Sequence, residues 1–531
     1  MTGLENGEST GFDSSLLTQF LAGVTSTVER IQAVEDVLKT AGASWRNLIG
    51  PWITRLVPAQ NLVPERHQDL RPLVEDAFQF VFSRLSDHRL AVKLVEQVEM
   101  PVDAPPETRL IKLIAKMPGL QKLGQVLARN RRLSPALREA LSELENSMAD
   151  VGPEEMTSII ASQLGSRMQT YQVEIEPAIF KEGSASAILR FTWRNPGKES
   201  DRGVFKVLKP YVVSYFAEDM TLLQQLGEYL STGDRQYGFA VRDLKDLLAE
   251  VRLLLEHELD VPLEQRTLGE AREMYRSSIG IRVPRLVAPL CTPQITAMTQ
   301  ENGVKVTEAC PRSPIRRLQI AVQLIEAIVA VPLFSRQDPA VFHADPHAGN
   351  LLYDEPNREL MVLDWALADR LSVETRRRLV MLVLMMNLRN RAGVCEAIQA
   401  LSESDPRPQR DALIEEMVTR FFEQFPADRS PGTLDAMRVL DEIALEGVHF
   451  PAPLFLFRKI LFTLDGVLQD VAGSEVRIDH VITREFVSRG IASFGLFHSP
   501  LSMKDLGSIQ WNALLYPTRL WARKRLRAGT A

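Results

Sequence analysis

The pattern of hydrophobic and polar positions separates helical stretches of the chain from a strand-rich one. From Leu16 to about Val98, apolar residues recur at the spacing of an amphipathic helix. Prolines interrupt this pattern and predict short helical pieces, at Pro51, Pro58, Pro64 and Pro72. Helical periodicity returns from Glu107 to about Leu164, after a proline-rich linker at residues 101–106. The first third of the chain is therefore predicted to be helical.

The pattern changes near Tyr171, where alternation and β-branched residues predict strands. In chain order, the expected elements are strands at 173–180, 188–193 and 203–208, a helix at 242–257, strand-like pieces at 281–287 and 295–298, a helix at 315–330, a hairpin at 351–365 and helices over 373–470. A small-residue loop, 182–187, joins the first two strands. This order predicts an α+β, protein-kinase-like two-lobed fold with a large helical N-terminal extension and a helical C-terminal region.

The same features divide the chain into five expected segments. They are a helical N-terminal region at 1–107 with about 14 disordered residues at its start, a further helical extension at 108–170, an N-terminal lobe at 171–303, a helical C-terminal lobe at 304–485 and a tail at 486–531.

Composition excludes several protein classes. The 531 residues carry 62 Lys+Arg and 68 Asp+Glu, a net charge of −6, and 45% are hydrophobic, which excludes wholesale disorder and a globally basic nucleic-acid coat. We expect no nucleic-acid partner. Three widely spaced cysteines, Cys291, Cys310 and Cys395, indicate a reducing compartment. No apolar run is long enough for a membrane span and no secretory signal begins the chain, so we expect a cytoplasmic protein.

Candidate chemistry is concentrated in Val341-Phe-His-Ala-Asp-Pro-His-Ala-Gly-Asn350 and the following Leu363-Asp-Trp-Ala366. Phosphoryl transfer needs a carboxylate that orients the acceptor and oxygen ligands that hold Mg²⁺ on the phosphates. Asp345, Asn350 and Asp364 have the order and spacing that protein kinases use, with a hairpin before the last of them. We therefore predict Asp345 as catalytic, and Asn350 and Asp364 as ligands of Mg²⁺.

Two other interpretations of this stretch stay open. An isolated Asp-x4-Asn is common in capped turns, although the hairpin, Asp364 and the histidines favour phosphoryl transfer. His343 and His347 are spaced as an i, i+4 zinc pair on a helix, but Pro346 and Gly349 argue against a helix there.

Lys206 lies in an apolar predicted strand, where an ammonium group is costly unless a carboxylate or phosphate meets it. We predict that Lys206 contacts nucleotide phosphates; the alternative is an edge-strand lysine in solvent. On the predicted helix that follows, Glu258 continues a leucine stripe and so requires a cation if the helix reaches it. Lys206 or Lys122 could supply that cation.

Together these motifs resemble the UbiB/AarF/ADCK atypical kinase family, also called ABC1 kinase-like proteins, over about residues 108–390. Lys122-Leu-Gly-Gln125 resembles the KxGQ signature, and Glu258-Leu-Asp260 the E-x-D element. His343–Asn350 resembles H-A-D-P-H-P-G-N, and Asp364-Trp-Ala366 stands at the D-F-G position.

The resemblance implies a KxGQ helix over the active site, ATP or ADP with Mg²⁺ as cofactors, and a link to isoprenoid quinone or other lipid metabolism. It makes Lys122 a gating residue among the catalytic set. The expected nucleotide-binding residues are Gly183, Ser184, Ala185, Ser186, Lys206, Glu258 and Met298, the first four in a loop that is alanine-rich in the family.

The chain departs from the family pattern at four places. Ala348 replaces a proline, Trp365-Ala366 replaces Phe-Gly, and Thr267 stands where the family has asparagine. The residues after Ser186 lack the glutamine that usually follows the loop. The last two departures concern nucleotide preference, whereas Ala366 restricts the backbone beside Asp364.

The C-terminal tail interleaves aromatic residues with a basic cluster, including Trp511, Trp521, Arg523, Lys524 and Arg525. Such a tail can make peripheral contact with anionic lipid headgroups. The alternative is a tail packed on the protein with solvated arginines.

The sequence therefore predicts an atypical kinase-like ATPase or phosphotransferase with a small-molecule or lipid-like acceptor. Two alternatives remain: a small-molecule phosphotransferase of the aminoglycoside/choline kinase type, and a catalytically silent nucleotide-dependent scaffold.

Overall fold

The computed structural model describes residues 23–24, 26–41, 43–62, 65, 68, 71–128, 151–183, 185–194, 199–231, 241–309, 313–404, 407–426, 428–473 and 476–492. The chain forms two compact units. Unit 1 contains the residues up to Val261 together with Val287–Ala297, and unit 2 contains Pro262–Leu286 and the residues from Met298 onward. The five segments expected from the sequence stay a prediction.

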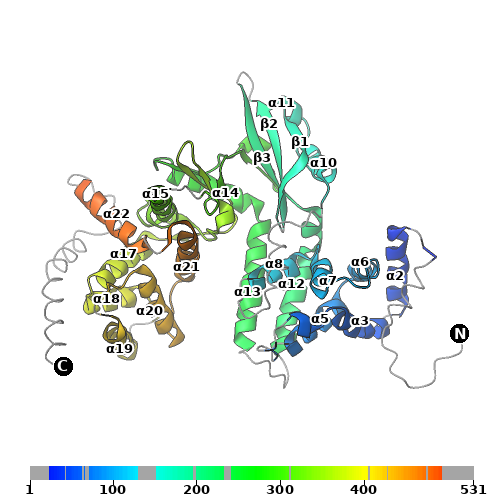
Figure 1. Cartoon of the computed structure of the whole chain (residues 1–531), viewed down its shortest axis with the longest axis horizontal. Helices are drawn as coiled ribbons and strands as arrows, with labels where there is room; N and C mark the ends of the chain where they lie inside the picture. Colours follow the sequence, from blue (N-terminus) through cyan, green and yellow to red (C-terminus); the bar gives the residue numbers. More distant parts are fainter. Residues whose placement is uncertain are drawn as a thin grey trace. The chain divides into compact units, whose positions relative to one another are not determined.

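Unit 1 combines a layer of helices with a four-stranded sheet (Figure 1). Its elements are α2 (Thr27–Ala41), α3 (Ala43–Leu56), α4 (Ala59–Leu62), α5 (Arg71–Arg84), α6 (Asp87–Val98), α7 (Pro106–Ile114), α8 (Pro118–Ala128), α10 (Pro153–Leu164), α11 (Arg167–Thr170), β1 (Glu174–Glu182), β2 (Ser186–Arg194), β3 (Ser200–Leu208), α12 (Pro210–Ser231), α13 (Val241–Leu259), the 3₁₀ turn Ala288–Leu290 and β5, which begins in this unit (Ile295–Thr299).

The sheet has the strand order β1-β2-β3-β5, and one of its faces is covered by α10. Alternate residues of β2, among them Leu189 and Phe191, are buried with Met156 and Ile160 of α10. This period of two matches the alternation in the sequence and confirms the three predicted strands. Lys206 lies on β3 opposite Ile188 of β2.

A second core in unit 1 joins the N-terminal helices to α8, α12 and α13. Figure 1 shows α12 and α13 side by side with α8 against them. Leu222, Leu226, Val251 and Leu255 are buried here, and Leu120 of α8 packs against them. The helix pattern on both long helices therefore faces one shared core.

One expectation for unit 1 was wrong, and one helix was missed. Pro51 does not break a helix, because α3 runs through it from Ala43 to Leu56. The helix expected at 242–257 is present as α13, but the 22-residue helix α12, which comes before it, was not predicted. Pro210 stands at its first position, where a missing amide hydrogen costs nothing.

Unit 2 is mostly helical, with two small sheets. Its elements are α14 (Val261–Met274, from the last residue of unit 1), β4 (Ile281–Arg282), β6 (Val304–Lys305), α15 (Pro314–Ile325), a π-helical turn (Glu326–Ala330), α16 (Val331–Leu333), β7 (Ala340–His343), a 3₁₀ turn (Ala348–Asn350), β8 (Leu351–Asp354), β9 (Glu359–Val362), β10 (Ala368–Leu371), α17 (Val373–Asn387), α18 (Arg391–Leu401), α19 (Pro408–Gln424), α20 (Thr433–Leu445), α21 (Ala452–Ala472) and α22 (Ile478–Ala492).

The predicted hairpin is present as β8 and β9, which pair antiparallel from Leu351↔Val362 to Asp354↔Glu359. Its second strand ends at Val362, three residues earlier than expected. Three short strands were not predicted. One is β6, which pairs with β8. The others, β7 and β10, pair with each other and lie on either side of the hairpin in sequence. The helix expected at 315–330 is α15 followed by the π-helical turn.

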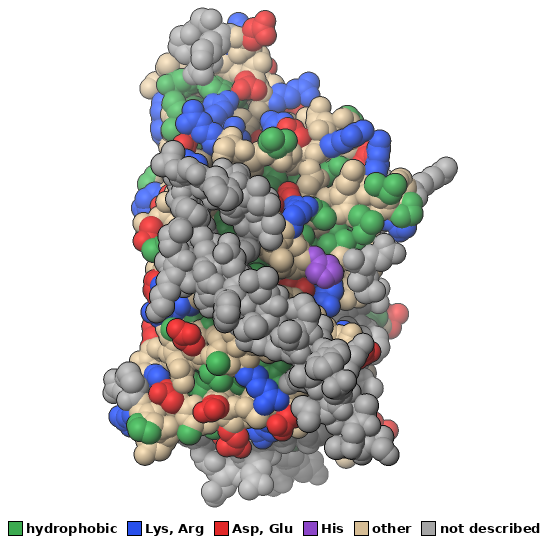
Figure 2. Space-filling model, turned by 90° about the vertical axis from the view of Figure 1, so that its left-hand side faces the viewer, with side chains coloured by type: hydrophobic (Ala, Val, Ile, Leu, Met, Phe, Trp, Pro, Cys, Tyr) green, Lys and Arg blue, Asp and Glu red, His purple; other side chains and the backbone are tan. Residues whose placement is uncertain are grey.

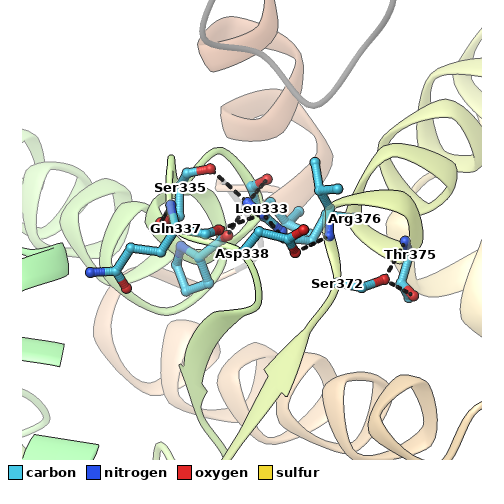
Figure 3. A network of polar contacts seen from close by, with 9 residues as sticks. Leu333, Ser335, Gln337, Asp338, Ser372, Thr375 and Arg376 are labelled. Carbon is cyan, nitrogen blue, oxygen red and sulfur yellow. Dashed lines mark hydrogen bonds and ion pairs between the residues drawn. The ribbon is translucent and has the colours of Figure 1, made fainter. Parts of the chain in front are cut away.

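Arg376 fixes the segment that leads into β7 (Figure 3). Its side chain is 1% exposed and donates hydrogen bonds of 2.7 Å to the main-chain oxygens of Ser335 and Gln337. Asp338, 3.9 Å from the guanidinium, accepts a 2.7 Å bond from the amide of Val373. One arginine of α17 thus satisfies carbonyls that no regular element pairs, and so anchors the start of β7.

On the face drawn in Figure 2, acidic and basic side chains of the described residues are interspersed. Single large apolar side chains are exposed in unit 2, including Ile279 and Leu445. Among the described residues, no helix combines the length and the apolar composition that a membrane crossing requires.

Candidate functional site

In unit 2, the His343–Asn350 motif forms the turn between β7 and β8. His343 ends β7, the 3₁₀ turn covers Ala348–Asn350, and β8 follows at once. The amide of Gly349 donates to Nδ1 of His347 at 3.0 Å, which caps that turn. A Cβ atom at Gly349 would lie 2.8 Å from the His347 ring, so a larger residue here would push the capping ring out of place. The motif is thus folded by its own short-range contacts.

His343 is a structural histidine at the base of this turn. It is fully buried; its Nε2 lies 2.8 Å from the main-chain oxygen of Leu363, and its Nδ1 accepts the amide hydrogen of Asp345 at 3.2 Å. Burial lowers the pKa of His343, and the bond to Leu363 opposes this only in part. Both ring nitrogens are therefore used by the backbone, which argues against the zinc alternative.

Asn350 links the turn to the loop of Asp364. Its Nδ2 donates to the main-chain oxygen of Asp345 at 3.1 Å, and its main-chain oxygen accepts the amide hydrogen of Leu363 at 2.9 Å. Asn350 is 8% exposed, whereas the side chains of Asp345 and His347 are about a third exposed and lie 3.7 Å apart. The structure therefore brings the backbone of Asp345, Asn350 and Leu363–Asp364 together in one network.

Asp364 lies in a backbone conformation that few residues adopt. Its φ is +55°, in the left-handed region that aspartate tolerates better than most side chains. Its exposed carboxylate accepts the amide hydrogen of Ala366 at 3.3 Å. The next residue, Trp365, is buried, donates to the oxygen of Val362 and packs edge-on against His343. The Trp-Ala departure from Phe-Gly thus places a larger ring in the core under the turn.

In unit 1, Lys122 of α8 forms an ion pair with Glu258 of α13. The helix α13 extends to Leu259, so Glu258 is helical and does not lie beyond the helix end. Lys122 is one of the two cations considered from the sequence, and the structure pairs it with Glu258. The pair is half-buried, with 14% of the Lys122 side chain and 24% of the Glu258 side chain exposed.

Lys206 is half-buried on β3, on the sheet face opposite α10. Gly183, Ala185 and Ser186 follow β1, where Gly183 donates to the oxygen of Ser186 at 2.8 Å; Ser184 lies outside the described residues. Met298 is half-buried on β5 and begins the second part of unit 2.

The sequence interpretation missed one buried ion pair beside this loop. Lys209 and Glu182 are 2.8 Å apart, with only 3% and 5% of their side chains exposed. The amide of Lys209 also donates to the oxygen of Ala185 at 3.0 Å. Glu182 ends β1 and Lys209 follows β3, so the pair closes both sides of the loop. The sequence pointed to this pair only through Lys209, three residues after Lys206, and no local pattern identified Glu182 as its partner.

A comparison with family models identifies one segment of the chain. Residues 143–398 match the model described as the ABC1 atypical kinase-like domain. This segment is an ABC1 atypical kinase-like domain. The resemblance to the UbiB/ADCK family is therefore confirmed, as is the kinase-like α+β fold.

Curated relatives of the ABC1 domain have kinase names. The chain is 23% identical over 358 residues to "Protein ACTIVITY OF BC1 COMPLEX KINASE 7, chloroplastic" of Arabidopsis thaliana, covering 66% of this chain and 50% of that protein. It is 26% identical over 243 residues to "Probable protein kinase UbiB" of Haemophilus ducreyi, covering 44% and 43%. The chain thus spans about half the length of these curated relatives.

Mycobacterium tuberculosis supplies two further matches. One is an uncharacterized protein, 26% identical over 419 residues, covering 74% of this chain and 80% of that one. The other is a solved complex with erythromycin, at 17% identity and a TM-score of 0.44, covering 63% of this chain and 82% of that one.

The polar side chains of the ABC1 domain can be compared with the ligands that a magnesium nucleotide requires. Asn350 donates through Nδ2, which leaves its carbonyl oxygen as the side-chain atom that can face a ligand. Asp345 and Asp364 add carboxylate oxygens. Oxygen ligands of this kind suit Mg²⁺, whereas the buried His343 offers no nitrogen to a metal. The donor set fits a magnesium nucleotide.

Proposed function

We propose that this chain is an atypical kinase-like protein that binds ATP or ADP with Mg²⁺ and acts as an ATPase or phosphotransferase. The acceptor would be water or a small-molecule or lipid-like hydroxyl, in support of isoprenoid quinone or lipid metabolism. The names of the curated relatives support the kinase class.

One observation carries the proposal most strongly. Two hydrogen bonds connect Asp345, Asn350 and the loop before Asp364: the Asn350 side chain donates to the main-chain oxygen of Asp345 at 3.1 Å, and the amide of Leu363 donates to the main-chain oxygen of Asn350 at 2.9 Å. These residues carry two carboxylates and one amide oxygen, the groups that phosphoryl transfer requires to orient the acceptor and to hold Mg²⁺.

The proposed roles follow from these contacts. Asn350 and Asp364 hold Mg²⁺, which neutralises phosphate charge, and Asp345 orients the acceptor hydroxyl or a water molecule. Lys206 contacts phosphates, and Lys122, held by Glu258, controls access to them.

Calorimetric titration with Mg·ATP and Mg·ADP tests the proposal. We expect the wild type to bind at least one of them, with affinity that falls when Mg²⁺ is chelated. Asp364→Asn should weaken Mg-dependent binding or turnover by about 100-fold or more, because it removes a charged metal ligand. Asp354→Asn, in the nearby β8–β9 turn, is the matched control and should leave both unchanged. A wild type that binds neither nucleotide contradicts the proposal.

Turnover measurements separate the alternatives. Release of inorganic phosphate from Mg·ATP that depends on Asp345 indicates an ATPase. Transfer of the phosphoryl group to an added acceptor, in place of phosphate release, indicates a phosphotransferase. Tight binding without turnover in the presence of candidate acceptors favours the scaffold. Lys122→Ala should change nucleotide handling in this protein, whereas an aminoglycoside/choline-type enzyme lacks that helix and would be indifferent to the change.

A further inference from the structure

The N-terminal turn of α8 is held by an acidic residue far away in the sequence. The amide of Gly119 donates to Oδ2 of Asp219, on α12, at 2.6 Å. The first amides of a helix have no partner within the helix, and an anion there also interacts favourably with the helix dipole. Asp219 is 2% exposed, so this contact is made away from water. It therefore fixes where α8 begins.

Asp219 is in turn held by Arg89 of α6. Its Oδ1 lies 2.7 Å from Nη1 of Arg89, which is itself 4% exposed. The guanidinium also lies 4.4 Å from the ring centroid of Tyr215, one turn before Asp219 on α12. Burial raises the pKa of Asp219, and the charge of Arg89 opposes that shift. A buried carboxylate in this place is tolerated because a cation and an amide both meet it.

The residue beside Asp219 does the same for another helix. Oε1 of Glu218 accepts the amide hydrogen of Ser86, which precedes α6, at 2.8 Å. Glu218 also lies 3.1 Å from Arg89. Two successive acids on α12 therefore hold the starts of two helices, Glu218 that of α6 and Asp219 that of α8. The contacts of Glu218 are with Ser86 and Arg89, at the start of α6, which makes it a matched comparison.

Space reinforces the anchor at α8. A Cβ atom at Gly119 would lie 3.1 Å from Cδ1 of Leu223 and 3.2 Å from Cβ of Asp219. A methyl group at this position would force these two side chains to move by a few tenths of an ångström. Lys122 comes three residues later, one helical turn along α8. Its distance from Glu258 on α13 therefore depends on where the first turn of α8 is fixed.

We propose that Asp219, supported by Arg89, is a positioning residue that holds α8 on α12 and so keeps Lys122 paired with Glu258. This inference deepens the proposed function, on which its consequence for the nucleotide rests. It assigns control of Lys122 to a buried network on α12 and α6 that meets α8 one helical turn before Lys122.

Amide hydrogen exchange of the full chain tests the first step without any nucleotide. In Asp219→Ala, the amides of residues 119–123 should exchange about tenfold faster or more, since the anchor of that turn is gone. Glu218→Gln is the control and should leave them unchanged. Equal exchange in Asp219→Ala and wild type overturns the inference. Where Asp219→Ala does not fold, Asp219→Asn keeps one acceptor for Gly119 and should show a smaller acceleration; Gly119→Ala should show the same opening by steric displacement.

A double-mutant cycle tests the second step, with Mg·ATP and Mg·ADP as the probes. Asp219→Ala should shift the ratio of the two dissociation constants in the same direction as Lys122→Ala. In the double variant the second change should add nothing, because both act through one contact. Additive effects would show that Asp219 stabilises the fold without acting through Lys122, and would overturn the inference.

The two proposals fail in different ways. If the wild type binds neither nucleotide, the proposed function is wrong, and exchange at residues 119–123 alone decides whether Asp219 positions α8. If nucleotide binding responds to Lys122→Ala but not to Asp219→Ala, the proposed function stands and this inference is wrong.

Discussion

The turn at residues 343–366 and the α6–α8–α12–α13 layer hold their polar residues by different means. In the turn, bonds such as that from Asn350 to the oxygen of Asp345 join residues five apart, and His343 contacts Leu363 only 20 positions away. In the helix layer, Gly119 and Asp219 are 100 positions apart, and Lys122 and Glu258 are 136 apart. The turn is held by hydrogen bonds between neutral side chains and the main chain, whereas the helix layer is held by ion pairs and hydrogen bonds of charged side chains.

This difference sets how each region should fail. A lost neutral hydrogen bond costs about 1 kcal/mol, but an ion left buried without its partner costs about 3–5 kcal/mol. Distance along the chain does not enter these energies, but burial does. The helix layer should therefore be the more sensitive of the two regions to single substitutions, except where its charges are exposed.

Arg89→Met should have the largest effect on stability. It leaves Asp219 buried without a cation, and we expect the free energy of unfolding to fall by about 3–5 kcal/mol in urea denaturation. Combining it with Asp219→Leu should recover part of the loss, because no buried ion remains unpaired. A loss below about 1 kcal/mol would contradict the contrast drawn here.

His343→Gln should cost less, about 2 kcal/mol, because the change removes packing on Trp365 and replaces backbone bonds with weaker ones. Denaturant titration at pH 7 measures it. A cost equal to that of Arg89→Met would remove the distinction between the regions.

The same variant carries a pH signature. Burial holds the pKa of His343 below its ordinary value of 6.5, so the unfolded chain takes up a proton in acid before the folded chain does. Stability should therefore fall as the pH drops below about 6.5, with a slope of up to about 1.4 kcal/mol per pH unit from this group. His343→Gln should lose that part of the slope. An unchanged slope would show that His343 does not stay neutral in the folded state.

Glu258→Gln should cost about 1 kcal/mol, because its pair with Lys122 is long-range but only half-buried. This variant separates the effect of burial from that of distance along the chain. If its loss of stability were as large as that of Arg89→Met, sequence distance would predict the cost of breaking an ion pair better than burial does. Urea denaturation of the two variants side by side measures the difference.

Arg252→Ala should have the smallest effect, below about 0.5 kcal/mol. Its ion pair with Glu256 joins neighbouring turns of α13, and about half of each side chain is exposed. Thermal unfolding should be nearly unchanged. A clear loss of stability would mean that Arg252 does more than this surface pair.

Much of the fold could be predicted from the sequence where the pattern was local. The three strands of unit 1 and the hairpin β8–β9 follow from alternation and turn residues within ten positions of one another. The short strands β7 and β10 were missed because each has only four residues, and those of β7 are all buried, so the sequence shows no alternation of apolar and polar positions there. Pro51 was misjudged because a proline can be carried inside a helix when tertiary packing outweighs the lost bond.

The sequence by itself determined much of the turn, since the contacts that fix it join residues no more than 20 positions apart, such as Asn350 with Asp345 and His343 with Leu363. Only the tertiary structure decided the partners of Glu258, Asp219 and Glu182. The reason is physical: an acidic residue on an amphipathic helix or at a strand end has the same local pattern whether water or a distant cation meets it. That choice is made by packing between elements, which no local spacing records.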